Sequence, residues 1–258
     1  MADYSTVTEI PGIKASREQI ARLFHRYHFA LPYCKYKDVL EVACGAGQGL
    51  GYLAKTANKV VGIDIEEKNL SYARETYKDR KNIELHIMDA HKLLFNDKSF
   101  DVILIYEAIY YLQRPEVFLN ACTRLLRKNG VLLICSVNRE WSDFNPSPYS
   151  TKYFSARELS ELLNTKFAAV QVFGAFSDEP DSLKDKGVSA VKRAAVALHI
   201  VPRTMKGKEA LKRIFFGKLV PLPAEVIEGM TDYDPPAPVP LDVPDIKDKV
   251  IYAVARLV

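Results

Sequence analysis

Apolar and polar positions change their spacing along the chain in a way that predicts alternating strands and helices. Continuous apolar or β-branched runs, typical of buried strands, occupy residues 37–43, 59–65, 83–90, 100–108, 130–138, 168–176 and 249–258. Apolar positions at helical spacing occupy residues 49–57, 67–79, 115–130 and 155–164. Strands and helices that alternate in this way predict an α/β fold, a parallel sheet with helices on both faces.

A long segment separates the last two predicted strands. Residues 177–248 are too many for a hairpin loop, and both ends of the segment return to strands that we expect to pair. Two helical patterns and one proline-rich run occupy residues 189–201, 207–220 and 232–245. We therefore interpret residues 177–248 as a cap inserted into a single domain that spans residues 1–258.

Composition and charge narrow the class of protein. The 258 residues are 48% hydrophobic and carry a formal net charge of +4, which is typical of a globular protein and does not by itself indicate a nucleic-acid partner. The N-terminus lacks the apolar core of a signal peptide, and no run of about 18 apolar residues predicts a membrane span. The four cysteines form no CxxC pair, so we expect a reducing, cytoplasmic protein with neither a structural metal nor a disulfide.

The stretch LEVACGAGQGL, residues 40–50, ends the first predicted strand with alternating glycines. Glycines let a backbone approach a ligand closely and adopt positive φ. A dinucleotide fingerprint requires glycine at position 50, where Leu50 stands, and the Lys-Ser/Thr of a phosphate-binding P-loop is absent. Glu41 would repel a phosphate but would favour a ligand that carries an ammonium or sulfonium charge.

Two further acids follow neighbouring strands. Asp64 closes the second strand, where a carboxylate can accept hydrogen bonds from both hydroxyls of a ribose. Asp89 closes the third strand, where it could accept a hydrogen bond from the amino group of an adenine. Each acid alone could be a solvated strand end. Together with Glu41 they suit a ligand with a ribose, an adenine and a cationic centre, which describes S-adenosylmethionine (SAM).

The sequence also resembles a known family. The segments DVLEVACGAGQGLGYLA, VVGIDI, HIMDA, FDVILIYEAIYYL and LLRKNGVLLICSVN are similar, in order, to the motifs of class I SAM-dependent methyltransferases of the type 11 kind, and the resemblance covers residues 24–175. It implies a Rossmann-like, mostly parallel sheet of seven strands with a reversed last hairpin. It also implies that the turn from Glu41 to Gly47 holds the methionine part of SAM. The cofactor residues implied in this way are Glu41, Ala43, Gly45, Gly47, Asp64, Ile65, Asp89, Ala90 and Tyr106, with Ala43 standing where many members have glycine.

A narrower likeness concerns the residues before the first strand. The segment HRYHFALPYCKYKDVLEVACGAGQG is similar to the opening of methyltransferases from glycan and secondary-metabolite pathways, which implies that Arg26 and Tyr27 face the carboxylate of SAM. Arg26 could equally be a solvated charge on an amphipathic helix. We expect residues 1–36 to form a helical lid and residues 177–248 to bind the acceptor.

Catalysis is less readable from the sequence. Members of the family often have Glu-His where this chain has Tyr110-Tyr111, so the obvious imidazole base is absent. Tyr111 is the candidate that would orient the acceptor, although a packed aromatic side chain is an equal interpretation. No residue pattern indicates a metal site.

These features predict SAM-dependent methyl transfer to a small or carrier-linked acceptor, most readily at a hydroxyl oxygen. Residues 182–220 are rich in Lys and Arg, which is typical of a solvated helix face but would also suit an anionic acceptor, RNA or a membrane surface. The alternatives are an RNA methyltransferase that uses this basic cap, a nicotinamide-dependent oxidoreductase, and a SAM-binding protein without catalysis. Nucleic acid is the less expected partner, peripheral membrane contact is possible, and the sequence predicts no oligomeric state.

Overall fold

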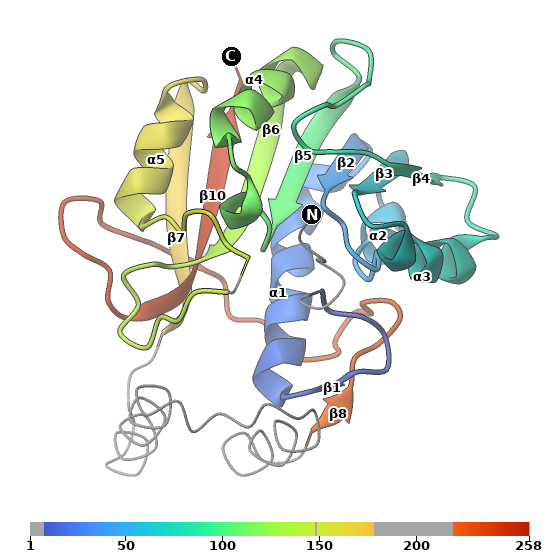
Figure 1. Ribbon diagram of the computed structural model, residues 1–258, viewed down its shortest axis with the longest axis horizontal. Coiled ribbons are helices and arrows are strands. Elements are labelled where there is room, and N and C mark those ends of the chain that lie inside the picture. Colours follow the sequence, from blue (N-terminus) through green and yellow to red (C-terminus); the bar gives the residue numbers. More distant parts are fainter. Residues whose placement is uncertain (1–7, 148, 178–218, 258) are drawn as a thin grey trace.

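The computed structural model describes residues 8–147, 149–177 and 219–257 (Figure 1). In this part of the chain the main sheet has eight strands in the order β4-β3-β2-β5-β6-β10-β7-β9. In chain order they are β2 (Asp38–Val42), β3 (Lys59–Asp64), β4 (Ile83–Ile87), β5 (Phe100–Tyr106), β6 (Leu126–Val137), β7 (Ala169–Ser177), β9 (Ala237–Pro238) and β10 (Asp248–Arg256). The strands β1 (Lys14–Ala15) and β8 (Val220–Pro221) form a separate two-stranded sheet.

Strand directions make the sheet mostly parallel with a reversed end. Strands β4, β3, β2, β5 and β6 pair in parallel, whereas β10 lies antiparallel between β6 and β7. The predicted Rossmann-like fold with a reversed last hairpin is therefore confirmed. The two-residue strand β9 beside β7 adds an eighth strand to the seven that were predicted.

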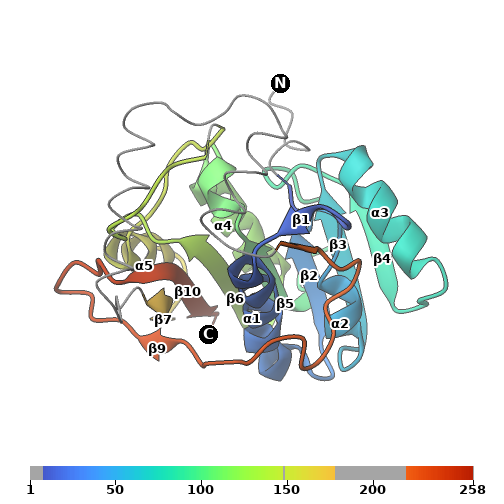
Figure 2. The ribbon, with the colours of Figure 1, turned by 90° about the horizontal axis from the view of Figure 1, so that it is seen from below.

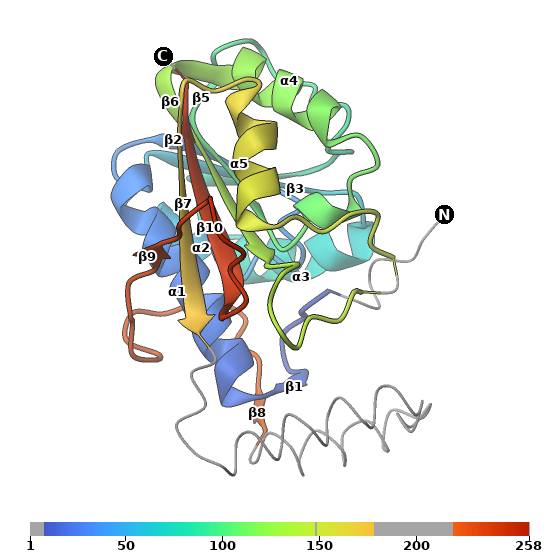
Figure 3. The same ribbon diagram turned by 90° about the vertical axis from the view of Figure 1, so that its left-hand side faces the viewer.

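Helices cover both faces of the sheet, as Figures 2 and 3 show. The helices are α1 (Arg17–Cys34), α2 (Leu50–Ala54), α3 (Glu67–Tyr77), the 3-10 turn η2 (Ile109–Tyr111), α4 (Pro115–Leu125) and α5 (Ala156–Asn164). Residues of α1, α2 and α3 share one core with one face of the sheet, and residues of η2, α4 and α5 share a second core with the other face. In β5, Leu104 joins the first core and Ile103 and Ile105 join the second, because successive side chains point to opposite faces.

The boundary between α4 and β6 differs from the sequence prediction. The apolar spacing predicts one helix over residues 115–130, but α4 ends at Leu125 and Leu126 already pairs with Phe100 of β5. Arg127 fixes this early start, since its guanidinium donates to Asp101 at 2.8 Å and to Asp38 at 2.9 Å. Sheet pairing and two ion pairs therefore outweigh the local helical pattern.

Part of the predicted cap can be located. Its two helical patterns lie almost entirely outside the described residues, whereas residues 219–248 are described. This return segment packs on the α1 and α2 side through Leu222 and Val226, and Val226 N–H donates to the carbonyl of Gln48 at 2.8 Å. Within the described part of the chain, no helix is long and apolar enough to cross a membrane. All four cysteines are buried free thiols.

Candidate functional site

A cavity of about 560 Å³ opens at the carboxyl ends of the parallel strands, where ligands bind in open α/β sheets. Its wall is built from α1, from the turn after β2, and from the segments that follow β3, β4 and β5. The predicted cofactor residues that line it are Arg26, Tyr27, Glu41, Ala43, Gly45, Asp64, Ile65, Asp89, Ala90 and Tyr106. Tyr111 lines it as well. None of the described residues of the return segment, 219–248, does so.

The glycine turn after β2 is held in an unusual backbone conformation. Ala43, Gly45 and Gly47 have φ values of +57°, +57° and +72°. This left-handed region costs a residue with a Cβ about 1–2 kcal/mol, so the preference for glycine at position 43 in the family has a direct cause. The turn is fixed because Gly45 N–H donates to Asp64 Oδ2 at 2.8 Å.

Gly47 is the predicted cofactor residue that the cavity does not include. Its carbonyl accepts a hydrogen bond from the hydroxyl of Tyr77 at 2.8 Å. A Cβ at this position would lie 2.7 Å from the Cβ of Ala73 on α3. Gly47 therefore lets the turn pack against α3, and its contact with the cofactor stays a prediction.

Glu41 is a buried carboxylate at the base of the cavity. The hydroxyl of Tyr27 donates to Glu41 Oε1 at 2.6 Å, and Glu41 Oε2 has no hydrogen-bond partner among the described residues. Burial raises the pKa of Glu41 to about 7, although the hydrogen bond from Tyr27 and the charge of Arg26 act to lower it. A buried carboxylate oxygen without a donor is costly, and a cationic or hydrogen-bonding ligand would satisfy it.

Asp64, at the end of β3, organises the adjoining backbone. Besides the bond from Gly45, its Oδ1 accepts the N–H of Glu66 at 2.9 Å and Nδ2 of Asn69 at 3.4 Å. Burial raises the pKa of Asp64, and these hydrogen bonds partly offset the effect. Ile65, the next residue, is 43% exposed, so an apolar surface borders the carboxylate.

Asp89 follows β4 at the edge of the parallel strands. The backbone N–H and the ring Nδ1 of His91 contact Asp89 Oδ1 at 2.8 and 2.9 Å. Burial acts to raise the pKa of Asp89, but these contacts outweigh burial and lower it. Asp89 is thus an ionised acceptor beside Ala90, about half exposed, with its second oxygen available to a ligand.

Tyr106 and Tyr111 lie on the β5 side of the glycine turn, away from Asp64 and Asp89. Tyr106 ends β5, is buried, and its hydroxyl has no hydrogen-bond partner among the described residues. The hydroxyl of Tyr111 lies 2.9 Å from Ser147 Oγ, in the loop after β6. The sequence interpretation of Tyr111 as an acceptor-facing residue therefore remains a prediction, since this side chain is also packed.

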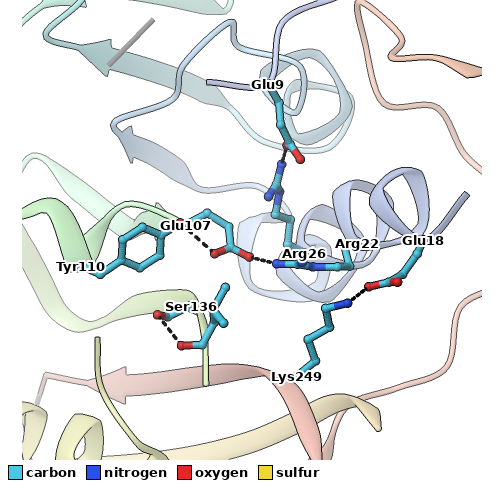
Figure 4. A network of polar contacts seen from close by, with 9 residues as sticks. Glu9, Glu18, Arg22, Arg26, Glu107, Tyr110, Ser136 and Lys249 are labelled. Atoms are coloured by element: carbon cyan, nitrogen blue, oxygen red, sulfur yellow. Dashed lines mark hydrogen bonds and ion pairs between the residues drawn. The ribbon is translucent and has the colours of Figure 1, made fainter. Parts of the chain in front are cut away.

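The sequence analysis missed a charged chain on this side of the cavity. Glu107 has φ of +51°. Its carboxylate forms an ion pair with Arg22 of α1 at 2.5 Å and accepts a hydrogen bond from the hydroxyl of Tyr110 at 3.2 Å (Figure 4). Arg22 and Glu107 are 85 residues apart in the chain. No local pattern connects them, and the only signal was an acid near the end of the fourth predicted strand, residues 100–108. Among the described residues, no group of three or more His, Cys, Asp and Glu could hold a metal ion.

The fold and the cavity define a Rossmann-like protein with an acid-rich pocket at the strand ends, and known proteins identify its class. Residues 40–134 match the methyltransferase domain family. A probable SAM-dependent methyltransferase of Mycolicibacterium smegmatis is 30% identical over 174 residues, which cover 65% of this chain and 66% of that protein. A fatty-acid O-methyltransferase of the same organism is 36% identical over 99 residues, 38% of this chain and 36% of that protein.

The solved structures agree on the fold. A SAM-dependent methyltransferase from Archaeoglobus fulgidus has a TM-score of 0.58 at 19% identity, with 94% of this chain and 95% of that chain covered. The chain belongs to the class I SAM-dependent methyltransferases, whose cofactor is SAM. It spans between 56% and 66% of the length of the curated relatives that match it over the longest segments.

Proposed function

We propose that this chain binds SAM in the cavity and transfers its methyl group to a hydroxyl oxygen of a small or carrier-linked acceptor. The observation that supports this proposal best is Glu41, a buried carboxylate with one unpaired oxygen beside the glycine turn. A ligand with a positive charge and N–H donors suits that oxygen, whereas a pyrophosphate would be repelled. The nicotinamide alternative is correspondingly disfavoured.

The residues present fit the chemistry of SAM. Glu41 would accept a hydrogen bond from the ammonium of the methionine part of SAM, and Arg26 would pair with the carboxylate of that part. Asp64 would accept the ribose hydroxyls, Ile65 would pack on the adenine, and Asp89 would read the adenine amino group. When bound, SAM supplies a methyl group on a positively charged sulfur. The volume of about 560 Å³ lies within the range of pockets that bury ligands of this size.

We assign the acceptor to the side of the cavity toward β6. The strand order puts Asp89, Asp64 and Glu41 on successive strands from the sheet edge, and β5 with Tyr106 and Glu107 comes next. Glu107 is a carboxylate that can accept a hydrogen bond from the hydroxyl of the methyl acceptor, and Arg22 forms an ion pair with it. A relative named as a fatty-acid O-methyltransferase supports oxygen as the acceptor atom.

Positioning accounts for most of the catalysis that we expect. Well-oriented reacting groups gain up to ~7–11 kcal/mol from alignment and exclusion of water. Tyr111 and Glu107 would orient the acceptor hydroxyl, and Glu107 would accept the proton that this hydroxyl loses when its oxygen is methylated. Contacts of residues 178–218 with RNA, an anionic acceptor or a membrane concern a segment outside the described residues and stay predictions from the sequence.

Calorimetric titration with SAM, S-adenosylhomocysteine, NAD and NADP tests the proposed cofactor. We expect the two adenosyl ligands to bind with dissociation constants on the order of micromolar, about −8 kcal/mol, and the nicotinamide cofactors not to bind. Radiolabelled SAM would then be used to screen hydroxylated acceptors, RNA and anionic lipid vesicles. Binding of NAD or NADP without the adenosyl ligands would overturn the proposal, and SAM binding without turnover on any acceptor would favour a non-catalytic protein.

Substitution of Asp64 tests the ribose assignment. Asp64→Ala should weaken S-adenosylhomocysteine binding by about 1–3 kcal/mol, because ribose hydroxyls would be left without an acceptor. It should also lower the free energy of unfolding, since the N–H groups of Gly45 and Glu66 lose their partner. Asp38→Ala is the matched control: Asp38 pairs with Arg127 at the opposite end of the sheet, so it should affect unfolding alone. Equal affinities for all three proteins would refute the assignment.

A further inference from the structure

The first described residues of the chain form a strap across the methionine side of the cavity. Thr8 and Glu9 both line it. Asn69 Nδ2, which also contacts Asp64, donates to Thr8 Oγ1 at 3.1 Å. A Cβ on Gly45 would lie 3.0 Å from the methyl carbon of Thr8, so the strap rests directly on the glycine turn.

The strap inserts a carboxylate into the cavity. Figure 4 shows Glu9 reaching down to Arg26 of α1, with which it forms an ion pair. The Arg26 side chain is 10% exposed and that of Glu9 is 33% exposed, so the guanidinium is the buried partner. Arg26 Nε is buried and has no hydrogen-bond partner among the described residues. A guanidinium can bind a carboxylate through two parallel N–H bonds, and Glu9 leaves this fork incompletely used.

Arg26 is also the residue to which the proposed function assigns the carboxylate of SAM. Two carboxylates on one buried guanidinium would repel each other, and burial strengthens that repulsion. The cofactor can supply a carboxylate that uses the whole fork, including Nε, whereas Glu9 must reach Arg26 from a strap above it. Glu9 and the cofactor carboxylate would therefore compete for the same buried guanidinium.

The backbone of the strap allows such an exchange. Its distal end is anchored, because Gly12 N–H donates to Leu222 O at 2.9 Å and Leu222 N–H donates to Ile13 O at 2.8 Å, next to the pairing of β1 with β8. Gly12 is exposed, has φ of +83°, and a Cβ there would meet no atom of the described residues within 4 Å. Rotation at Gly12 would release its own N–H but can lift Thr8 and Glu9 while the bond from Leu222 N–H to Ile13 O and the pairing of β1 with β8 stay in place.

We propose, on the basis of the proposed function, that Glu9 is a built-in competitor of the cofactor carboxylate, so that the strap must release Arg26 for SAM to bind. Glu9 thereby sets the affinity of the site for ligands with a carboxylate and leaves ligands without one unaffected. The opposite role, in which Glu9 contacts the ammonium of SAM and strengthens binding, predicts the reverse effect of removing its charge.

Glu9→Gln, measured with two ligands, separates these roles. The probes are S-adenosylhomocysteine, which carries the amino-acid part, and 5′-methylthioadenosine, which lacks it. We expect the variant to bind S-adenosylhomocysteine about tenfold more tightly, equivalent to about 1.4 kcal/mol, and to bind 5′-methylthioadenosine as the wild type does. Glu18→Gln is the control, because Glu18 lies in the first turn of α1, the helix that carries Arg26, pairs with Lys249 and does not line the cavity.

Each result has a distinct meaning. Weaker or unchanged binding of S-adenosylhomocysteine by Glu9→Gln would overturn the competition, and so would an equal gain for both ligands or an equal gain in Glu18→Gln. If wild type and both variants bind neither adenosyl ligand, the proposed function itself is wrong and the competition falls with it. Thermal unfolding of each variant verifies that the proteins compared are folded.

Discussion

At the scale of single residues, Glu41 depends on neighbours that are remote in the sequence. Its partner Tyr27 comes from α1 and passes so close to Gly49 that a Cβ there would lie 1.9 Å from the tyrosine ring. Gly49 is therefore required for Tyr27 to reach the carboxylate. The sequence analysis identified Glu41 and the glycines, but it could not show that the glycine at 49 serves a tyrosine from another element.

The pKa of Glu41 predicts a pH dependence of stability and of binding. Because burial raises this pKa from 4.5 to about 7, the folded protein holds a proton that the unfolded chain has lost between those values. The resulting stabilisation is fully present below about pH 4.5 and is lost as the pH rises through about 7. A cationic ligand favours the ionised form, so its binding should release a proton below pH 7 and tighten as the pH rises to that value.

Calorimetry of S-adenosylhomocysteine binding in buffers of different ionisation enthalpy measures this proton. Glu41→Gln should bind about tenfold more weakly at pH 8, because a neutral amide replaces the charge, equivalent to about 1.4 kcal/mol. It should also show no proton release between pH 5.5 and 7. Asp89→Asn is the control, since the pKa of Asp89 is already low and the variant should keep the proton release. Release that persists in Glu41→Gln would assign the proton to another group.

At the scale of elements, local periodicity predicted well what local contacts decide. The strand ending at the glycine turn and the strand ending at Asp64 were predicted within a residue or two, because both are buried on two faces. The start of β6 was wrong because Arg127 finds partners 26 and 89 residues away. The strand β9 could not be predicted, since two residues within a proline-rich run carry no period.

The capping box of α5 is an element-level prediction that can be tested separately from the site. Ser155 Oγ accepts a hydrogen bond from Glu158 N–H at 3.2 Å, and Glu158 Oε2 accepts one from Ser155 N–H at 2.9 Å. Ser155→Ala should lower the free energy of unfolding by about 1 kcal/mol, because the backbone N–H of Glu158 in the first turn of α5 loses its acceptor. Ser71→Ala, on the exposed face of α3, is the matched control and should have no such effect.

Chemical denaturation of both alanine variants gives the comparison. Binding of S-adenosylhomocysteine should be unchanged in Ser155→Ala, because α5 belongs to the core on the other face of the sheet from α1. Equal destabilisation in the two variants would mean that the hydroxyl of Ser155 does not act as a cap.

At the scale of the whole molecule, the site is assembled from segments that no local pattern links. The sequence predicted the acids Glu41, Asp64 and Asp89, because each lies at or near the end of a strand. It did not predict Glu9, Arg22 or Glu107 as members of the cavity, since their proximity depends on how α1 crosses the sheet. A charge on an amphipathic helix has the same local pattern whether it faces solvent or a pocket.

The return segment of the insertion, residues 219–248, contacts the site through Gln48. The amide Nε2 of Gln48 donates to Pro223 O at 3.0 Å, while its backbone carbonyl accepts Val226 N–H at 2.8 Å. Gln48 itself is buried and lines the cavity. A segment about 175 residues further along the chain therefore clamps the end of the glycine turn.

Gln48→Ala tests this clamp. We expect the free energy of unfolding to fall by about 1 kcal/mol, because the partly buried carbonyl of Pro223 loses its donor. We also expect S-adenosylhomocysteine to bind several-fold more weakly, because the turn that faces the ligand is less well held; the loss is below the tenfold that 1.4 kcal/mol represents. Asn58→Ala is the matched control, since it removes an exposed amide hydrogen bond to Tyr36 O away from the cavity and should leave both quantities unchanged. A Gln48→Ala protein that is less stable but binds with wild-type affinity would mean that the return segment supports the fold alone, and that the glycine turn keeps its shape through Asp64 without it.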